Sequence, residues 1–573
     1  MAVVTIDQHE ITIPDARRLN VIEAARLVGI EIPHYCWHPG LSVVGSCRMC
    51  LVEMGRRDPR TGKVEMLEKL VPACSTPAQD GMVIVTDSEK VRRARAMVEE
   101  GLLLRHPIDC PICDKAGECS LQDFHFKYGQ GERRADLRPF TSRRRDVGDV
   151  TLFVDRCVMC SRCVRFAAEV SGTHELMVTR RGAREEIDVV DGFPLANNLS
   201  GNVVDLCPVG ALCDKDFLYR QRVWYMRKHP GVCTGCATGC SIWVEENQDR
   251  IYRLRPRENR LVNKWWICNE GRYGYHHVHD PGRLIRPRRR EGESTIELDW
   301  TTLPSELESR LKRAGRLAVV LSPHLTVEEA YLLCKFVRQI DRQAALVLGP
   351  IPTVGADEHF PGGFTVSAEK CPNRRGVEAI VAHFSDRMTM FEEFLPELER
   401  GRIRGVWVAG GYKTDWIDET TARRFDAVEV LVVQDLFPSL LGIGAEIGGA
   451  RFHRARHVGN VPHSQRHVGN VPHSQRATYE LPAAAFAERN GSYVNRGDRL
   501  QSAPWAIRPP AGVRTEGSLF WELLGRAGLY DARAVLNEVA REILYFSAAL
   551  GPLPDVGIDL KVNLLANDDK STI

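Results

Sequence analysis

CVMCSRC (residues 157–163) and DLCPVGAL (residues 205–212) are the two segments from which the organisation of this chain is best read. They supply the cysteines Cys157, Cys160, Cys163 and Cys207. Thiols in such tightly spaced groups are typical metal ligands. Because a cysteine followed directly by proline also ends the ligand runs of ferredoxins, these four residues form a candidate [4Fe–4S] ligand set.

The positions around these cysteines indicate that a second cluster has been lost. In two-cluster ferredoxins the run C-x2-C-x2-C-x3-C-P occurs twice, and the fourth cysteine of each run ligates the other cluster. The missing ligand positions are Ala167, Asn197, Ser200 and Val203. All four ligands of one cluster are thus replaced together, so we predict a ferredoxin-like domain over 141–222 with one cluster. Cys213 is left over and is interpreted as a small buried residue.

The N-terminal segment is predicted to form a β-grasp domain over residues 1–87. Residues 2–13 alternate as a hairpin, and a helical pattern over 20–28 ends at a glycine. The following loop and a later residue supply the candidate [2Fe–2S] ligands Cys36, Cys47, Cys50 and Cys74. A structural zinc ion remains the alternative, since Zn²⁺ also accepts four thiolates.

The next module is HPIDCPICDKAGEC (106–119), which follows a helical pattern over 88–105. Its candidate ligands are His106, Cys110, Cys113 and Cys119. A set of one histidine and three cysteines also suits zinc, but the neighbouring cluster motifs favour [4Fe–4S]. We therefore predict a helical cluster domain over 88–140.

A fourth set of ligands is predicted in the domain over 223–285. GVCTGCATGC (231–240) and WWICNEGRYGY (265–275) supply Cys233, Cys236, Cys240 and Cys268. A zinc ribbon is the alternative, and the CxxCxxxC spacing with the WICxxGR ending favours [4Fe–4S].

The second half of the chain is predicted to be an α/β domain over 286–540. Apolar runs at 317–321, 405–409 and 428–433 indicate buried strands, and 327–340 has a helical pattern. The perfect tandem repeat RHVGNVPHSQ (456–475) is predicted to be an exposed loop, and 541–573 a short tail. The basic runs at 143–145 and 286–290 are interpreted as linkers or as rims that face a partner.

Composition excludes several classes of protein. The chain has 573 residues, too many for one core, and its formal net charge of +2 gives no global field for nucleic acid. Sixteen of the 18 cysteines lie between Cys36 and Cys268, in tight groups that fit a disulfide framework poorly. With no apolar run of about 18–20 residues and no signal peptide pattern, we expect a cytosolic protein that contacts membranes only through partners.

The order of the four modules resembles the large iron–sulfur subunit (the G subunit) of NADH:quinone oxidoreductase, respiratory complex I. The resemblance covers residues 1–280 and continues weakly to about 505, where LPAAAFAERNGSYVNRGDRLQ (481–501) is similar to molybdopterin-oxidoreductase-like domains. It implies a multidomain α+β chain: a β-grasp ferredoxin domain, a helical domain whose cluster has one histidine and three cysteine ligands, a bacterial-ferredoxin-like domain, and a molybdopterin-oxidoreductase-like cluster domain with a shortened α/β domain.

The resemblance also implies a function. The chain would hold one [2Fe–2S] and three [4Fe–4S] clusters and relay single electrons from an NADH/FMN flavoprotein subunit to quinone-side iron–sulfur subunits. Electrons would enter near the [2Fe–2S] and His106 sites and leave through the Cys157 site, with the Cys233 site off this path. The location implied is the cytoplasmic side of the bacterial inner membrane, peripheral, with no NADH or quinone site in this chain.

Related enzymes supply the alternative, an iron–sulfur/molybdopterin subunit of an NAD-linked formate dehydrogenase or hydrogenase. Formate dehydrogenases place a lysine two residues after the last cluster cysteine, where this chain has Glu270. Hydrogenases of the iron-only class need further cysteines, but only Cys334 and Cys371 follow Cys268. We therefore expect no molybdopterin. The 23 residues between Cys50 and Cys74 indicate an insertion near 55–63.

Overall fold

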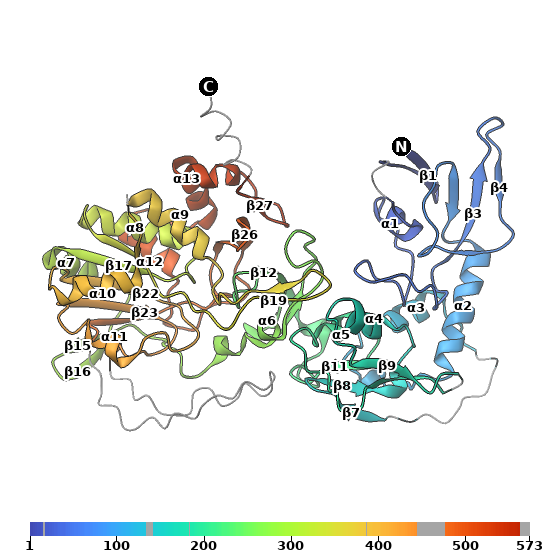
Figure 1. The fold of residues 1–573 in the computed structure, drawn as a ribbon, viewed down its shortest axis with the longest axis horizontal. Coiled ribbons are helices and arrows are strands. Elements are labelled where there is room, and N and C mark those ends of the chain that lie inside the picture. The colour runs from blue at the N-terminus through green and yellow to red at the C-terminus, as the bar shows by residue number, and fades with distance from the viewer. Residues whose placement is uncertain are drawn as a thin grey trace. The chain divides into compact units, whose positions relative to one another are not determined.

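The computed structural model describes residues 1–14, 18–132, 134, 141, 143–182, 184–385, 387–443 and 476–561. The chain divides into two compact units, coloured blue to green and green to red in Figure 1. Unit 1 comprises Met1–Met226 with Phe360–Gly363, and unit 2 comprises Arg227–His359 with Phe364–Ile573. The tandem repeat at 456–475 lies outside the described residues.

Unit 1 begins with the predicted β-grasp arrangement. The elements are β1 (Ala2–Ile6), β2 (His9–Ile13), α1 (Val21–Arg26), β3 (Leu51–Arg57), β4 (Val64–Met66), β5 (Val71–Pro72) and β6 (Met82–Val85). The strand order is β2-β1-β6-β3-β4, with β5 paired to β3 and β1 parallel to β6. Asn20 begins α1 through a capping box with Glu23, which satisfies backbone donors at the start of the helix. The segment predicted to be an insertion, 55–63, comprises the end of β3 and the turn to β4.

The rest of unit 1 consists of the long helix α2 (Glu89–Leu103) and of shorter elements, with the candidate ligand cysteines in loops or at helix ends. They are α2 (Glu89–Leu103), η1 (Cys110–Ile112), α3 (Ser120–Tyr128), β7 (Arg144–Asp146), β8 (Val150–Phe153), η2 (Val154–Arg156), α4 (Arg162–Glu169), β9 (Leu176–Thr179), β10 (Glu186–Val189), α5 (Asn202–Leu206), β11 (Leu212–Asp214) and η3 (Val223–Tyr225). One sheet has the order β11-β8-β7, and β9 and β10 form a hairpin.

The linker interpretation of the first basic run is wrong, because Arg144 and Arg145 belong to strand β7. Arg143 forms ion pairs with Asp155 and Glu186, both at 2.8 Å, and Arg145 pairs with Asp188. The ion pairs therefore attach this segment to η2 and β10, which supply the carboxylates.

Unit 2 begins with a three-stranded antiparallel sheet that carries the fourth set of cysteines on its loops. It contains β12 (Arg227–Val232), β13 (Ser241–Asn247) and β14 (Arg250–Pro256), followed by α6 (Asn269–Tyr273) and η4 (His276–His279).

The centre of unit 2 is an eight-stranded sheet of order β16-β15-β24-β23-β22-β17-β18-β21. Its strands are β15 (Arg288–Glu291), β16 (Ser294–Glu297), β17 (Leu317–Leu321), β18 (Ala345–Leu348), β21 (Thr389–Met390), β22 (Gly405–Ala409), β23 (Val430–Asp435) and β24 (Tyr479–Pro482). The run from β24 to β21 is parallel, and β15 is antiparallel to β24. The predicted strands 317–321 and 405–409 are confirmed.

Helices cover both faces of this sheet (Figure 1). On one face lie α7 (Leu303–Ala314), α8 (Val327–Ile340), α9 (Arg374–Phe384), α12 (Glu516–Leu523) and α13 (Ala532–Glu542), and on the other α10 (Phe391–Glu399) and α11 (Glu419–Arg423). In β17, Leu317, Val319 and Leu321 join the first core, whereas Ala318 and Val320 join the second. Burial on both faces explains why these strands are continuously apolar. The predicted helix at 327–340 is confirmed as α8.

Two sequence interpretations of unit 2 are wrong. The second basic run includes part of β15 rather than a linker, because Arg288 and Arg289 pair with Glu480 and Glu306. The predicted tail begins with folded chain: η5 (Leu544–Ala549) packs on α13, and β27 (Ile558–Asp559) pairs with β26 (Arg499–Ala503). The segment is rich in apolar residues, but Gly551, Pro552, Pro554 and Gly557 interrupt any helical or strand period.

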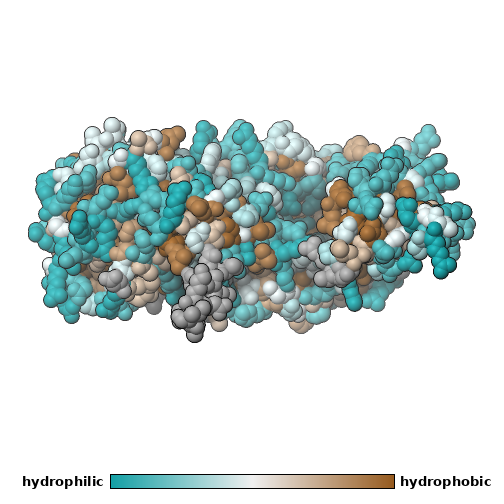
Figure 2. Space-filling view, turned by 90° about the horizontal axis from the view of Figure 1, so that it is seen from above, coloured by the Kyte–Doolittle hydropathy of each residue, from teal (hydrophilic) through white to brown (hydrophobic). Residues whose placement is uncertain are grey.

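The remaining described strands of unit 2 are β19 (Glu358–His359), β20 (Thr365–Val366) and β25 (Gly491–Val494). The surface seen in Figure 2 is mostly hydrophilic, with apolar side chains scattered among polar ones. Among the residues that the structure describes, no helix combines the length and apolar character needed to cross a bilayer.

Candidate metal centres

The structure brings together the four cysteines predicted to hold the [2Fe–2S] cluster. Cys36, Cys50 and Cys74 are each 1% exposed, and Cys47 is half-buried. The thiols of Cys47 and Cys74 hydrogen-bond to Cys36 and, with backbone N–H groups of Ser46 and Cys47, hold its pKa below the usual thiol value. Donors aimed at a sulfur stabilise the thiolate, the form that binds metal.

At the second group, His106 and three cysteines occupy the segment between α2 and α3. Cys113 and Cys119 are buried, whereas Cys110 is half-buried. Burial, followed by the charge of Arg156, lowers the pKa of His106 to about 4, so the imidazole is neutral as metal ligation requires. The buried His106 Nδ1 has no hydrogen-bond partner among the described residues. An orphaned ring nitrogen in this place fits the predicted ligand role.

The third group lines a single small cavity in unit 1. Cys157, Cys160, Cys163 and Cys207 share its walls with apolar residues that include Leu152, Ile187 and Val209. The backbone N–H of Met159 donates to Cys157 Sγ at 3.3 Å. The donor set and the apolar lining both fit an iron–sulfur cluster.

The positions of the lost second cluster are filled by packed side chains. Ala167, Ser200 and Val203 are fully buried. Cys213 is 4% exposed, and its thiol donates to the carbonyl of Gly210 at 3.6 Å.

In the fourth group all four cysteines are buried, whereas each of the other groups has one half-buried cysteine. Cys233, Cys236, Cys240 and Cys268 are all 6% exposed or less. The N–H groups of Gly235 and Gly271 donate to Cys233 Sγ at 3.4 Å and Cys268 Sγ at 3.3 Å. A Cβ on Gly271 would lie 2.9 Å from Cys233 Sγ, so glycine keeps the sulfurs accessible to a cluster at this point.

The remaining cysteines have no place in these groups. Cys334 lies in α8, and Cys371 donates to Glu369 at 3.4 Å. None of the eighteen cysteines forms a disulfide. No group of three or more His, Cys, Asp or Glu side chains within the described ranges is arranged to hold a single metal ion.

Two arginines of α4 connect the first and third groups, and sequence analysis missed them. Arg162 donates to the carbonyls of Leu206 at 3.2 Å and Trp37 at 2.7 Å, residues that adjoin Cys207 and Cys36. Arg165 donates to the carbonyls of Cys36 and Cys160. Their positions in the sequence could have identified them, because Arg162 lies within the ligand run CVMCSRC and Arg165 lies two residues after it.

Similar contacts connect the third group to the second. Arg156, which precedes Cys157, donates to Asp109 Oδ2 at 3.0 and 2.9 Å, and Asp109 precedes Cys110. The N–H of Ser120 donates to the carbonyl of Pro208 at 2.9 Å. Residues that adjoin the third group therefore contact residues that adjoin, or belong to, both other groups of unit 1.

A buried carboxyl group lies beside these sites. Glu99 is 0% exposed and accepts a hydrogen bond from the hydroxyl of Tyr35, the neighbour of Cys36. Burial raises the pKa of Glu99 to about 7, although the Tyr35 hydrogen bond opposes the shift. Below pH 4.5, the usual value, the carboxyl is protonated in both the folded and unfolded states.

This shift predicts a pH-dependent stability. As pH rises from 4.5 to about 7, the folded state retains a proton that the unfolded state releases, so the unfolding free energy falls. We expect wild type to lose up to about 3 kcal/mol over this window relative to Glu99→Gln. Urea unfolding of both proteins across the window measures the difference. Parallel curves for the two proteins would show that Glu99 does not titrate there.

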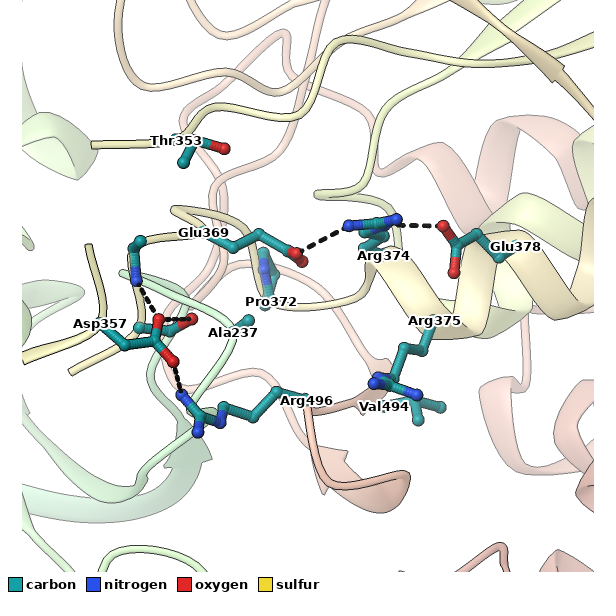
Figure 3. Close-up of a pocket in the computed structure, with 12 residues that line it drawn as sticks. Ala237, Thr353, Asp357, Glu369, Pro372, Arg374, Arg375, Glu378, Val494 and Arg496 are labelled. Atoms are coloured by element: carbon teal, nitrogen blue, oxygen red, sulfur yellow. Dashed lines mark hydrogen bonds and ion pairs between the residues drawn. The ribbon is translucent and has the colours of Figure 1, made fainter. Parts of the chain in front are cut away.

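A cavity of about 630 Å³ opens beside Ala237, the residue after Cys236. In Figure 3, Arg374 lies between Glu369 and Glu378, at 3.1 and 2.7 Å, and Arg496 lies beside Asp357. Carboxylates thus balance these guanidinium groups. The cavity differs from the unpaired cationic cradles that bind phosphate groups.

Four domain families match successive parts of the chain. Residues 2–89 match the 2Fe-2S iron-sulfur cluster binding domain, and 95–134 match the NADH-ubiquinone oxidoreductase-G iron-sulfur binding region. Residues 149–213 match the ferredoxin-like domain of NADH-quinone oxidoreductase subunit 3, and 226–280 match the molybdopterin oxidoreductase Fe4S4 domain. These matches confirm the predicted fold class, with one 2Fe-2S domain and several 4Fe-4S domains.

Curated relatives point the same way. The NADH-quinone oxidoreductase G subunit of Streptomyces coelicolor is 35% identical over 59% of this chain and 39% of its own length. The protein of the same name from Rickettsia conorii is 33% identical over 58% of this chain and 48% of its own length. NADPH-Fe(3+) oxidoreductase subunit alpha of Geobacter sulfurreducens is 35% identical over 60% of this chain and 40% of its own length.

One solved structure is also similar in sequence. An NAD+-reducing [NiFe]-hydrogenase in the H2-reduced state shares 30% identity over 39% of this chain and 91% of its own, with a TM-score of 0.33. The matches to the three curated relatives span less than half the length of each one. Within those limits, the chain is similar to the G subunit of NADH-quinone oxidoreductase, and its four cluster-domain matches lie between residues 2 and 280.

Proposed function

We propose that this chain is an electron-relay subunit of an NADH:quinone oxidoreductase, and that it holds one [2Fe–2S] and three [4Fe–4S] clusters. One observation carries the proposal: four groups of cysteines, one of which also contains His106, lie in four successive domains that match cluster-binding families. The order of these domains is the one expected for the large iron–sulfur subunit. When bound, the clusters supply one-electron redox chemistry.

Sixteen residues are proposed as ligands. They are Cys36, Cys47, Cys50 and Cys74 for [2Fe–2S]; His106, Cys110, Cys113 and Cys119; Cys157, Cys160, Cys163 and Cys207; and Cys233, Cys236, Cys240 and Cys268 for the three [4Fe–4S] centres. The corresponding domains are proposed over 1–87, 88–140, 141–222 and 223–285, followed by an α/β domain from 286.

The surrounding residues hold and shield these sites. Apolar side chains exclude water, and backbone N–H groups of Met159, Gly235 and Gly271 donate to sulfur, two factors that set a cluster's potential. The contacts of Arg156, Arg162 and Arg165 support a relay in which the Cys157 site adjoins the other two sites of unit 1.

The partners we propose are an NADH/FMN flavoprotein subunit and quinone-side iron–sulfur subunits, with the assembly peripheral on the cytoplasmic face of the membrane. The experiment is to delete the gene and assay NADH oxidation by quinone in membranes. Complementation with the wild-type gene should restore the rate. Full NADH:quinone activity in the deletion strain would contradict the proposal.

A second candidate follows from the Geobacter sulfurreducens relative, named as a subunit of an NADPH-Fe(3+) oxidoreductase. Purified assemblies should therefore be assayed with NADPH and Fe(3+) as well as with NADH and quinone. Activity with the first pair alone would favour this candidate. Stoichiometric molybdenum would favour the formate dehydrogenase alternative over the relay.

The neutral ligand His106 leads to a prediction for its site. His106→Cys places an anionic thiolate where an imidazole stood, and this lowers the reduction potential because the more negative centre is harder to reduce. We expect a shift of at least about tenfold in the reduction equilibrium, about 59 mV for one electron. Redox titration monitored by electron paramagnetic resonance measures it, with the other three centres as controls. An unchanged potential in a fully loaded variant would exclude His106 as a ligand.

A further inference from the structure

The loop after β22 carries a lysine to the fourth group of cysteines. The carboxylate of Asp435 accepts hydrogen bonds from the N–H groups of Gly411 at 2.8 Å and Tyr412 at 3.1 Å, and from Trp416 Nε1 at 2.8 Å. Gly411 has φ +83°, a conformation that favours glycine. These bonds fix the backbone from which Lys413 extends.

The ammonium group of Lys413 is held against the residue that follows Cys233. Lys413 Nζ donates to the carbonyl and to the hydroxyl Oγ1 of Thr234, both at 2.9 Å. Both acceptors are uncharged, and Thr234 is 5% exposed. Burial lowers the pKa of Lys413, and the negative charges of Cys233 and Glu270 oppose that shift. Lys413 therefore brings a cation to this site, and no carboxylate of the described residues forms an ion pair with it.

A second lysine near the same site is neutralised. Lys370 Nζ forms an ion pair with Glu270 Oε2 at 2.7 Å. Glu270 is the residue two positions after Cys268, so this pair adds little net charge near the ligands. The charge of Lys370 is therefore compensated by a carboxylate, whereas the charge of Lys413 is not. Only an uncompensated charge acts strongly on a nearby cluster.

We propose that Lys413 is a positioning residue that raises the reduction potential of the centre held by Cys233, Cys236, Cys240 and Cys268. Reduction adds one negative charge, and a fixed cation in a poorly hydrated environment stabilises the reduced form more than the oxidised form. This inference rests on the proposed function only in requiring a cluster at these four cysteines.

The test is to replace Lys413 by Met, which keeps most of the length of the side chain and removes the charge. In the full chain at neutral pH, the midpoint potential of this centre should fall by at least about 59 mV. For a one-electron couple, this corresponds to about a tenfold change in the reduction equilibrium. Titration monitored by electron paramagnetic resonance reads the potential, and the centres of unit 1 should not shift. An unchanged potential with full iron content would overturn the inference.

Three variants separate charge from structure. Lys413→Arg should restore the wild-type potential, and Lys370→Met should shift it less than Lys413→Met. Lys413→Gln keeps a donor for the oxygens of Thr234, so it should retain the cluster at the lowered potential. Loss of the cluster in both uncharged variants would overturn the inference in favour of a purely structural role. Absence of the cluster from the wild type would instead contradict the proposed function.

Discussion

Cys207→Ser is expected to remove one [4Fe–4S] centre, about four iron atoms per chain, and to lower NADH:quinone turnover by more than about 100-fold. Cys207 lines the same cavity as Cys157, Cys160 and Cys163, so its loss leaves three thiols around the proposed cluster. The contacts to both neighbouring sites make this the centre whose loss interrupts the relay most directly. Iron analysis, electron paramagnetic resonance and turnover measure the effects.

Cys213→Ser is the matched control. Cys213 is a buried cysteine of the same domain, six residues further along the chain, and it is not a proposed ligand. We expect this variant to keep all four centres and most of the turnover. Equal loss in the two variants would mean that burial of a thiol, rather than ligation, explains the effect. Normal turnover in Cys207→Ser would place that centre off the electron path.

Arg283→Met is expected to lower the unfolding free energy of unit 2 by about 3–5 kcal/mol, because it leaves a buried carboxylate without its partner. Arg283 donates to both carboxylate oxygens of Glu488, at 2.6 and 2.7 Å, and to the carbonyl of Val278 at 2.7 Å. These bonds join the segment after the fourth ligand group to the segment after β24. Urea unfolding followed by circular dichroism measures the change.

Arg508→Met provides the comparison, because its ion pair is exposed. Arg508 binds Asp249 at 2.6 Å, but its side chain is 77% exposed. Water and salt screen such a pair, so we expect a change of only about 0–1 kcal/mol. A similar loss in both variants would contradict the role given to burial. A second replacement, Glu488→Leu, in Arg283→Met should recover part of the stability, since it removes the unpaired charge.

The sequence predicted elements well where local pattern and tertiary burial agree. Helix α8 was predicted over its full length from its helical pattern, and the structure adds a capping box between Thr326 and Glu329. Strand β23 lies two residues later than predicted, at Val430–Asp435. Its last residue is a buried carboxylate that binds the β22 loop, and apolar pattern alone does not reveal such a role.

Residues around the candidate sites were harder to find, because distant parts of the chain supply them. Cysteine spacing alone identified the predicted ligands, because their motifs are local in sequence. Lys413, by contrast, is 179 residues from Thr234 in sequence, and no local pattern connects them. The strand β15 was missed for a related reason: its arginines resemble a solvated linker until Glu306 and Glu480 are placed beside them.

The central claim is that the grouped thiols bind iron and inorganic sulfide. The most direct measurement is the iron, zinc and acid-labile sulfide content of the anaerobically purified chain. The account predicts about 14 iron atoms and about as many sulfides per chain, without stoichiometric zinc. A colourless protein that contains zinc and no acid-labile sulfide would contradict it.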